Sequence, residues 1–381
     1  MQKLAIIGAS YLQKPLVCKA KEMGLYTLCF AWRDGAVCAD IVDEFYDISI
    51  VEKEQILSIC AEAQIDGICT IASDVAAPTV AYIAEKMGLV GNLYEAAVKA
   101  NNKYLMRNAL IKAGVPCPKY MCVTPKTLHT PDAIDSLRKF HYPIIVKPSD
   151  RSGSLGVTKV ETLEEYYSAI NLAIEKSFKH EAMIEEYIEG REISVEFISY
   201  NGIHYPLQIT DKVTTEAPHF VELEHHQPSS LTEEMFCEIY EITKNALSAL
   251  GVTNGASHSE YKITSEGHIA VMEIGGRMGG DFIGSDLVRL STGYDFVRGV
   301  IEVALGNFKI PQKTMNKYAG VYFLCGETPY IKQIIDNKDK YAEIVQAEIS
   351  NPELKDVSCS ADRSGYFIYQ SDRKMILTHE G

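Results

Sequence analysis

The residues with the clearest chemical potential lie in the stretch SHSEYKITSEGHIAVMEIGGRMGGD, residues 257–281. A tight hairpin between its two strand-like runs pairs Glu260 with Val271, which makes Glu260 and Glu273 diagonal neighbours on one sheet face, with Cβ atoms roughly 7 Å apart. Two ionised carboxylates at close range repel each other, and a bridging Mg²⁺ or Mn²⁺ relieves that repulsion. The alternative is a pair of solvated surface glutamates.

An arginine follows this carboxylate pair. Arg277 stands four residues beyond Glu273, between the pairs Gly275-Gly276 and Gly279-Gly280. Glycines let a backbone approach a ligand closely, and a guanidinium binds oxyanions with two parallel hydrogen bonds. The stretch therefore predicts that Arg277, Gly279 and Gly280 contact a ligand.

A second candidate site is the segment YPIIVKPSDRSGSLGV, residues 142–157. Its apolar β-branched run ends at Lys147, and residues 157–160 form a return strand, so the glycines join two strands. A glycine-rich loop that leads from a strand into a helix is absent from this chain, so a phosphate bound here meets a different geometry. Lys103, near the start of a helix where the dipole disfavours a cation, also suits an anionic ligand, although an exposed lysine is equally compatible.

Two further polar groups have alternative interpretations. Ser73 and Asp74 follow a strand at the carboxyl end of the expected sheet, where such sheets bind ligands, but either residue is also suited to cap a helix. In AMIEEYIEGREISVEFIS, alternation places Glu192, Ser194 and Glu196 on one strand face, a pattern that most often faces solvent.

The first ninety or so residues alternate strand and helix patterns. The runs LAIIGAS, YTLCFAW and GICTIAS indicate strands, and the ranges 12–23, 53–63 and 76–87 have helical spacing. This alternation predicts an open parallel α/β domain. The sequence GAS after the first strand lacks the later glycines of a dinucleotide fingerprint, so nicotinamide binding is not indicated.

Composition excludes several classes of protein. The chain has 381 residues, of which 46% are hydrophobic and 23% charged, and a formal net charge of −14, which disfavours nucleic acid as a partner. Ten cysteines are scattered singly, as expected for reduced cytosolic thiols. Neither a signal peptide nor a membrane span of about 20 apolar residues is visible. We expect a cytoplasmic protein that binds neither nucleic acid nor membrane, and a homodimer is compatible with the sequence.

The ordered set of these motifs resembles the ATP-grasp superfamily over roughly residues 1–310. The set comprises a lysine near a helix start, a strand-ending lysine, a Ser/Gly loop, EEYIEG.E and EI..R.GGD. The resemblance implies an α/β fold, α+β in its ATP-grasp part. The expected order is a parallel α/β domain at 1–95, an ATP-grasp domain at 96–310 with lobes at 96–184 and 185–310, and a small C-terminal α/β subdomain at 311–381.

The resemblance also implies a role for each motif in binding ATP and magnesium. Glu260 and Glu273 are similar to the family's metal ligands, and Arg277 resembles its arginine that stabilises an acyl phosphate. Ser154 is implied to assist at the transferring phosphate. Many members have Asn at the position of Gly275, which leaves the number of metal ions open. The implied nucleotide-binding residues are Lys103, Lys147, the loop Ser152, Gly153, Ser154, Leu155 and Gly156, the connection Glu185, Glu186, Tyr187 and Ile188, and Glu192.

The activity implied by the resemblance is an ADP-forming carboxylate-amine ligase of the L-amino-acid ligase branch, which joins a small-molecule carboxylate to an amine. Implied substrate contacts are Arg277, Gly279, Gly280 and His226, or its neighbour His225, with a surface or turn histidine as the alternative for both. Ser73 and Asp74 are added from their place at the carboxyl end of the expected sheet. Two alternatives stay open at this point. One is a bicarbonate-activating enzyme similar to biotin carboxylase or carbamoyl phosphate synthetase, and the other is a protein that binds ATP without turnover.

Overall fold

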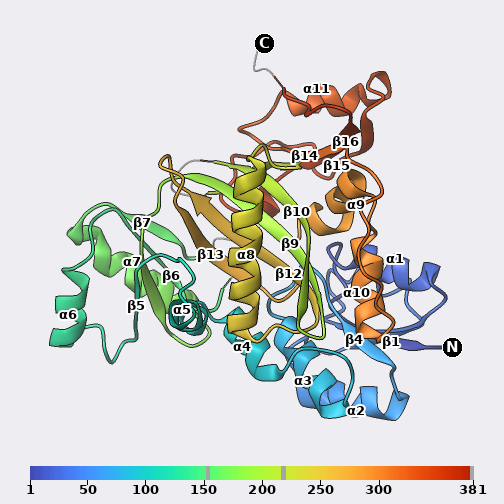
Figure 1. Cartoon of the computed structure of the whole chain (residues 1–381), viewed down its shortest axis with the longest axis horizontal. Coiled ribbons are helices and arrows are strands. Elements are labelled where there is room, and N and C mark those ends of the chain that lie inside the picture. The colour runs from blue at the N-terminus through green and yellow to red at the C-terminus, as the bar shows by residue number, and fades with distance from the viewer. Residues whose placement is uncertain (152–154, 216–219, 378–381) are drawn as a thin grey trace.

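The chain is described here from a computed structural model that covers residues 1–151, 155–215 and 220–377. It contains three sheets, with the N-terminal segment beside one edge of a large twisted sheet and a smaller sheet on its opposite side (Figure 1). The predicted mixed α/β fold is confirmed. Within the described ranges, no helix is both long and apolar enough to cross a membrane.

The N-terminal sheet is parallel, with strand order β3-β2-β1-β4. Its three predicted strands and three predicted helices are all present, because buried apolar runs alternate with amphipathic segments. The strand β3 was not predicted, since its four residues are only partly buried and carry no clear alternation. The elements are β1 Lys3–Ile7, α1 Lys14–Glu22, β2 Tyr26–Ala31, β3 Glu44–Asp47, α2 Lys53–Ala63, β4 Gly67–Cys69 and α3 Ala77–Met87.

Two short helices, α4 (Tyr94–Asn101) and α5 (Lys103–Lys112), lead into a small antiparallel sheet of order β5-β8-β6-β7. The predicted hairpin of β6 and β7 is confirmed by the pairs Val146 with Thr158 and Ile144 with Val160. Helix α7 packs its apolar side on this sheet, so Lys147 stands at the end of a rigid strand. The remaining elements are β5 Tyr120–Val123, α6 Pro131–Leu137, β6 Ile144–Pro148, β7 Thr158–Val160, α7 Leu163–Lys176 and β8 Ala182–Glu186.

The large sheet has eight strands in the order β13-β12-β9-β10-β11-β14-β16-β15. Helix α8 covers one of its faces, where Ile239 and Leu247 join Val195 and Phe197 in one core cluster (Figure 1). Helix α10 joins the core cluster that links this sheet to the N-terminal sheet. The elements are β9 Arg191–Tyr200, β10 Ile203–Thr214, β11 Glu222–Gln227, α8 Glu233–Leu250, β12 Gly255–Ile263, β13 Ile269–Gly275, a π-helical turn Ile283–Leu287, α9 Val288–Thr292 and α10 Phe296–Ala304.

The C-terminal region, expected from the sequence as a small α/β subdomain, is joined to the large sheet. Its strand β14 (Tyr318–Leu324) pairs with β11, for example Ala319 with Gln227, so the region extends the large sheet. Strand β14 is almost fully buried, and it could not be left as an isolated edge. The domain boundaries remain predictions. The further elements are α11 Ile331–Asp336, β15 Ile344–Ile349 and β16 Gly365–Ser371.

The register of the β12–β13 hairpin also differs from the expected one. Glu260 lies directly opposite Glu273 rather than Val271. The regular part of the ladder, which pairs Tyr261 with Val271, is one residue out of the expected register, and the ladder shifts by one more residue between Glu260 and Tyr261. A β-bulge of this kind inserts one residue and re-aims the side chains beyond it. The two carboxylates are therefore direct cross-strand partners, closer than the diagonal arrangement that regular pairing gives.

Candidate active site

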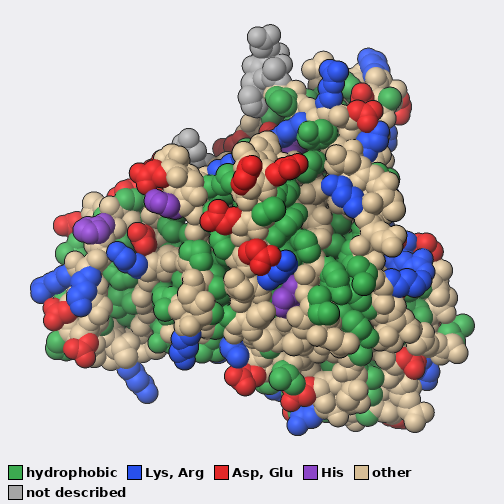
Figure 2. All heavy atoms as spheres, in the orientation of Figure 1, with side chains coloured by type: hydrophobic (Ala, Val, Ile, Leu, Met, Phe, Trp, Pro, Cys, Tyr) green, Lys and Arg blue, Asp and Glu red, His purple; other side chains and the backbone are tan. Residues whose placement is uncertain are grey.

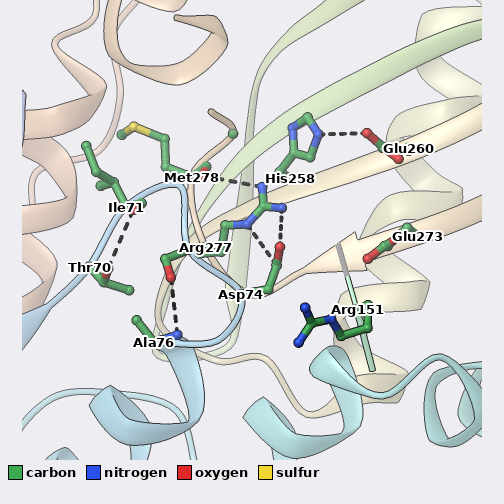
Figure 3. Close-up of polar contacts among 12 residues, drawn as sticks. Thr70, Ile71, Asp74, Ala76, Arg151, His258, Glu260, Glu273, Arg277 and Met278 are labelled. Carbon is green, nitrogen blue, oxygen red and sulfur yellow. Dashed lines mark hydrogen bonds and ion pairs between the residues drawn. The ribbon is translucent and has the colours of Figure 1, made fainter. Parts of the chain in front are cut away.

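A cavity of about 220 Å³ lies between the small sheet and the large sheet. Nine of the residues that the sequence singled out line it, although they come from segments far apart in the chain. Figure 3 shows Glu260, Glu273 and Arg277 on the large-sheet side, with Arg151 nearby. The polar and charged lining residues are Lys103, Lys147, Arg151, Tyr187, Glu192, Lys212, Glu222, His258, Glu260, Lys262, Glu273 and Arg277.

A buried lysine that was not predicted from the sequence neutralises carboxylates on one wall of this cavity. The ammonium of Lys212, on β10, lies 2.7 Å from Glu260, 2.9 Å from Glu192 and 3.4 Å from Glu222. Burial disfavours the charged lysine, but the three carboxylates outweigh it and raise the pKa of Lys212 well above its ordinary value. β10 carries polar residues at alternate positions, a pattern that is also typical of a solvated sheet face. Only the fold shows that this face is the cavity wall.

The second metal-ligand candidate, Glu273, is held by Lys103. The Lys103 ammonium lies 2.9 Å from Glu273 and donates to the carbonyl oxygen of Arg151 at 2.8 Å. Lys103 is 6% exposed, so the alternative of an exposed lysine is wrong. Asn102 caps helix α5 by accepting from Leu105, which fixes the start of the helix and places Lys103 in the cavity.

Lys147 belongs to a buried ion triad. Its ammonium lies 2.5 Å from Glu185, and Glu185 also accepts from Arg107 Nε at 2.8 Å. Burial alone would raise the pKa of Glu185, but Arg107 and Lys147 lower it to about 2. In this arrangement the Glu185 side chain is a counter-ion for two cations, and the side chains of Tyr187 and Ile188 line the cavity. Arg107, the third member of the triad, was not predicted as a site residue because its helix has an ordinary pattern of polar and apolar residues.

Arg277 is oriented by Asp74, from the loop after β4. Arg277 donates from Nε to Asp74 Oδ1 at 2.8 Å and from Nη2 to Oδ2 at 2.7 Å, as Figure 3 shows. Burial would raise the pKa of Asp74, but Arg277 and, more weakly, Lys103 keep it below its ordinary value. Ser73 accepts from the Ala76 backbone at 3.3 Å, which closes the turn before α3, whereas the N-cap of that helix is Ala76 and has no side-chain cap.

The Asp74–Arg277 pair explains why glycine stands at position 275. A Cβ atom at Gly275 would lie 2.8 Å from Asp74 Oδ1 and 3.2 Å from Arg277 Cζ. An asparagine there would push the Asp74 carboxylate away from the guanidinium. Glycine at position 275 thus leaves room for the pairing of Arg277 with Asp74. The same glycine cannot provide the third side-chain metal ligand that an asparagine would provide.

A buried Glu196–His258 pair supports the wall between Glu260 and the glycine loop. The Nδ1 atom of His258 contacts Glu196, its Nε2 atom lies 3.3 Å from Glu260 (Figure 3), and Glu196 accepts from the Gly279 backbone at 3.0 Å. Burial would lower the pKa of His258, but Glu196 and Glu260 raise it to about 9. The expectation that Glu196 and Ser194 face solvent is wrong, because both are fully buried. A Cβ atom at Gly279 would lie 2.7 Å from both side chains of the pair, so this glycine is needed for packing.

Other predicted residues lie elsewhere. His226 is buried against the C-terminal strands, with Nδ1 2.9 Å from the Tyr369 hydroxyl and Nε2 2.8 Å from Glu224. It does not line the cavity, because β11 turns it towards β16, and its substrate role finds no support in this geometry. His225 is also buried, and burial lowers its pKa well below the ordinary value. Glu186 accepts from the Lys119 backbone at 3.3 Å.

Part of the expected phosphate loop lies outside the described residues, namely Ser152, Gly153 and Ser154. Leu155, which follows them, lines the cavity and is 42% exposed. Gly156 has a φ of +74°, which glycine adopts without strain. Gly280 borders a separate small cavity beside Tyr11 rather than the main one.

The charges on the outer surface are distributed differently from those that line the cavity. On the described part of the face in Figure 2, acidic and basic side chains are interspersed and form no single basic area. Lys103, Lys147 and Lys212 are instead buried around the cavity, and the half-buried Arg277 lines it. Each of these cations is paired with a carboxylate, and each lies where a small anionic ligand in the cavity could become a further partner.

Comparison with known proteins confirms the expected resemblance. Residues 140–286 match the ATP-grasp domain family. The alanine–anticapsin ligase of Bacillus subtilis strain 168 is 32% identical over 249 residues, which cover 60% of this chain and 51% of that protein. An L-arginine-specific L-amino acid ligase of Bacillus subtilis is 25% identical over 318 residues, 81% of this chain and 75% of that protein. The chain thus spans about half the length of the alanine–anticapsin ligase.

Solved structures show the same fold over nearly the whole chain. The L-amino acid ligase of Bacillus licheniformis superposes with a TM-score of 0.81 at 23% identity, covering 98% of this chain and 94% of that one. The N5-carboxyaminoimidazole synthetase of Staphylococcus aureus complexed with ADP gives a TM-score of 0.78 at 17% identity, with 98% and 94% coverage. At these identities the likeness concerns the fold.

Proposed function

Because residues 140–286 of this chain form an ATP-grasp domain, we propose that the protein is an ATP-dependent, ADP-forming carboxylate-amine ligase. It joins an amino acid or another small carboxylic acid to an amine. One observation carries the proposal: two facing carboxylates, Glu260 and Glu273, and an oriented arginine, Arg277, share one cavity with buried lysines. This set suits transfer of a phosphoryl group to a carboxylate.

We assign nucleotide binding to the small-sheet side of the cavity. Lys147 and Lys103 provide positive charge for the phosphates, and Tyr187 and Ile188, which line the cavity, are placed for the adenine. Glu192, held by Lys212 and Lys262, is assigned to the ribose hydroxyls. Lys212 joins this set as a further cation within reach of the phosphates. The loop of residues 152–156 is assigned to the phosphates by family resemblance alone.

Glu260 and Glu273 fit a divalent cation in their chemistry. Their carboxylate oxygens are hard ligands, and the direct cross-strand pairing brings them to one face of the sheet. Within the described ranges, no group of three His, Cys, Asp or Glu side chains converges as a complete metal cage. Two carboxylates are in keeping with Mg²⁺, which usually takes one or two from the protein and completes its octahedron with waters and phosphate oxygens. When bound, the cation would neutralise charge on the phosphates.

The proposed reaction has two steps. The substrate carboxylate attacks the γ-phosphorus of ATP, which breaks the bond to the β-phosphate oxygen and releases ADP. The amine then attacks the acyl carbon, inorganic phosphate leaves, and the amine nitrogen loses a proton. Arg277, fixed by Asp74, is positioned to stabilise the charge that develops on the phosphoryl and acyl oxygens.

The products test this proposal. The purified chain is incubated with ATP, Mg²⁺, a panel of amino acids as carboxylates and a panel of amines. We expect ADP and inorganic phosphate in a one-to-one ratio with an amide. Formation of AMP and pyrophosphate would mean attack at the α-phosphorus and would exclude the acyl-phosphate route. ADP release that needs bicarbonate instead of an amino acid would favour the carboxylating alternative, and binding of ATP without any turnover would favour a non-catalytic role.

A further inference from the structure

Arg151 differs from the other cations of the main cavity in its charge partner. Within the described ranges, six lysine and arginine side chains line this cavity, and five of them form ion pairs with carboxylates. Those five are Lys103, Lys147, Lys212, Lys262 and Arg277. Arg151 is the sixth, and Figure 3 shows it near Glu273. No carboxylate of the described residues lies within ion-pair distance of Arg151, so its charge is available to an anionic ligand.

The guanidinium of Arg151 packs on an aromatic ring instead. Its Cζ atom lies 4.2 Å from the centre of the ring of Phe178, in the turn after α7. Phe178 is 66% exposed, so water surrounds much of this contact. A cation–π contact at such an exposed ring is weak, whereas a guanidinium makes two parallel charge-assisted hydrogen bonds to a phosphate. A phosphate in the cavity therefore competes successfully with the ring for Arg151.

The backbone that carries Arg151 is held from two sides. Lys103 Nζ donates to the carbonyl oxygen of Arg151 at 2.8 Å, and the same ammonium lies 2.9 Å from Glu273. The preceding residue, Asp150, accepts from the backbone N–H of Phe178 at 3.1 Å. Because the main chain is anchored, rotation of the side chain is what moves the guanidinium between the ring and the cavity. The anchor also places Arg151 beside Glu273, the metal-ligand candidate.

We propose that Arg151 distinguishes ATP from ADP: its guanidinium leaves the Phe178 ring and binds the γ-phosphate of ATP. The inference rests on the ATP-dependent function proposed above and adds a specificity-determining residue to it. The γ-phosphate is the expected partner because Arg151 is anchored beside Glu273, and a catalytic magnesium bridges the β- and γ-phosphates. ADP lacks this group, so it leaves Arg151 on the ring. A ligand shifts such an equilibrium only by its differential affinity for the two states, so Arg151 favours the substrate nucleotide over the product.

Calorimetry on the full chain with Mg²⁺ tests this preference. It compares ADP with the β,γ-imido analogue of ATP, which has a γ-phosphate but cannot be turned over. Arg151→Ala should weaken binding of the analogue by about tenfold or more and that of ADP by less than about twofold, and Arg151→Lys should recover part of the loss. Arg138→Ala, an exposed arginine after α6, is the matched control and should change neither affinity. Wild-type binding of the analogue by Arg151→Ala, or an equal loss for both nucleotides, would overturn the inference.

Removal of the ring tests the exchange itself. Phe178→Ala deletes the partner that Arg151 leaves, so the analogue should bind about two- to fivefold more tightly, while ADP binds as in the wild type. In the Arg151→Ala background the same substitution should have no effect on the analogue, because the competing contact is already lost. Phe178→Leu keeps an apolar side chain without an aromatic face and should behave as Phe178→Ala. Unchanged or weaker binding of the analogue by both Phe178 variants would show that the ring does not compete with phosphate, and would overturn the exchange.

These titrations separate the inference from the proposed ligase function, because they require no turnover. A wild type that binds both nucleotides but forms no amide would exclude the ligase function, and the difference between the analogue and ADP in Arg151→Ala would still decide the inference. Amide formation by Arg151→Ala with the wild-type KM for ATP would overturn only the inference. A wild type that binds neither nucleotide would overturn both. The ADP affinity of Arg151→Ala also serves as the folding control, since a misfolded variant would lose it together with the affinity for the analogue.

Discussion

Glu260 faces Glu273 across the β12–β13 ladder, and a different lysine holds each carboxylate. Lys212 lies 2.7 Å from Glu260, and Lys103 lies 2.9 Å from Glu273. A divalent cation that binds both glutamates has to compete with these two ammonium groups. Phosphate oxygens offer the lysines new charge-assisted partners, so we expect the cation to bind far better together with ATP than alone.

The first prediction concerns the metal. Glu273→Gln removes one carboxylate charge and should raise the Mg²⁺ concentration for half-maximal activity by at least about tenfold, since even losses of supporting groups around a metal cost 10–100-fold. The measurement is ADP release against Mg²⁺ concentration at saturating ATP. Glu266→Gln, in the exposed turn of the same hairpin, is the control and should behave as wild type. An unchanged Mg²⁺ requirement in Glu273→Gln would remove Glu273 from the metal site.

The second prediction concerns nucleotide affinity. Lys147→Ala should weaken ATP binding about ten- to hundredfold, as expected for the loss of one charge-assisted contact of roughly 1.5–3 kcal/mol. The ion triad adds an effect on stability. Glu185 would keep only Arg107 as a partner, so the free energy of unfolding should fall by about 1–3 kcal/mol.

Calorimetry with ATP and urea unfolding measure these two effects of Lys147→Ala separately. Lys112→Ala, at the exposed end of α5, provides the control and should change neither quantity. Wild-type ATP affinity in Lys147→Ala would show that this lysine only balances the charge of Glu185.

How far the sequence predicts this fold depends on the kind of signal. The N-terminal sheet follows from periodicity, because each strand and helix carries its own local pattern. The partner of Glu260 was not predicted, because the hairpin is one residue out of the expected register and a one-residue bulge adds a second offset that the alternation of apolar residues does not mark. The pairing of β14 with β11 was not predicted either, because it is a long-range contact that composition does not encode.

Part of the predicted residue set lies together in the fold, but the contacts between these residues were not predicted. Lys147, Glu260, Glu273 and Arg277 line one cavity, as expected from their ordered motifs. Their partners Arg107, Lys212 and His258 were missed, because each sits in a regular helix or strand where a polar residue normally indicates solvent. A strand that forms the buried wall of a cavity shows the same alternation of apolar and polar residues as a strand with an exposed face. Only the tertiary structure distinguishes the two.

The third prediction compares Arg277 with the carboxylate that orients it. Arg277→Ala should lower kcat about a hundred- to a thousandfold with little change in Mg²⁺ dependence, as for loss of a donor aimed at transition-state charge. Arg277→Lys should restore part of this activity, since a point charge cannot make the two-pronged contact. Asp74→Asn keeps the shape of the partner but not its charge, so it should lower kcat less than Arg277→Ala does.

Steady-state kinetics with saturating ATP and substrates checks this order. Arg298→Ala, on the half-exposed side of α10, removes an arginine of the same size from a helix pair with Glu302 and should leave kcat unchanged. If Asp74→Asn were as active as the wild type, the Asp74–Arg277 pair would be unnecessary for orienting the guanidinium. If Arg277→Ala kept full activity, Arg277 would have no catalytic role and the GGRMGGD stretch would be interpreted as a structural turn.

The fourth prediction concerns the dependence of stability on pH. The pKa of His258 is raised to about 9 in the folded chain, against about 6.5 when unfolded, because Glu196 and Glu260 outweigh the burial that would lower it. Folding thus favours the protonated imidazole. The resulting stability is fully present below pH 6.5 and is lost as the pH rises through 9. A difference of this size corresponds to up to about 3 kcal/mol.

Urea unfolding of the protein without nucleotide or metal, at pH 6.5 and at pH 9, measures this loss. His258→Gln has no titrating ring and should be less stable than the wild type at pH 6.5, with a much smaller difference between the two at pH 9. His268→Gln, exposed in the turn of the same hairpin, should keep the wild-type dependence. Other groups that titrate near pH 9 are common to all three proteins and cancel in the comparison. If His258→Gln lost as much stability between the two pH values as the wild type does, the Glu196–His258 pair would not hold the imidazole in its charged form.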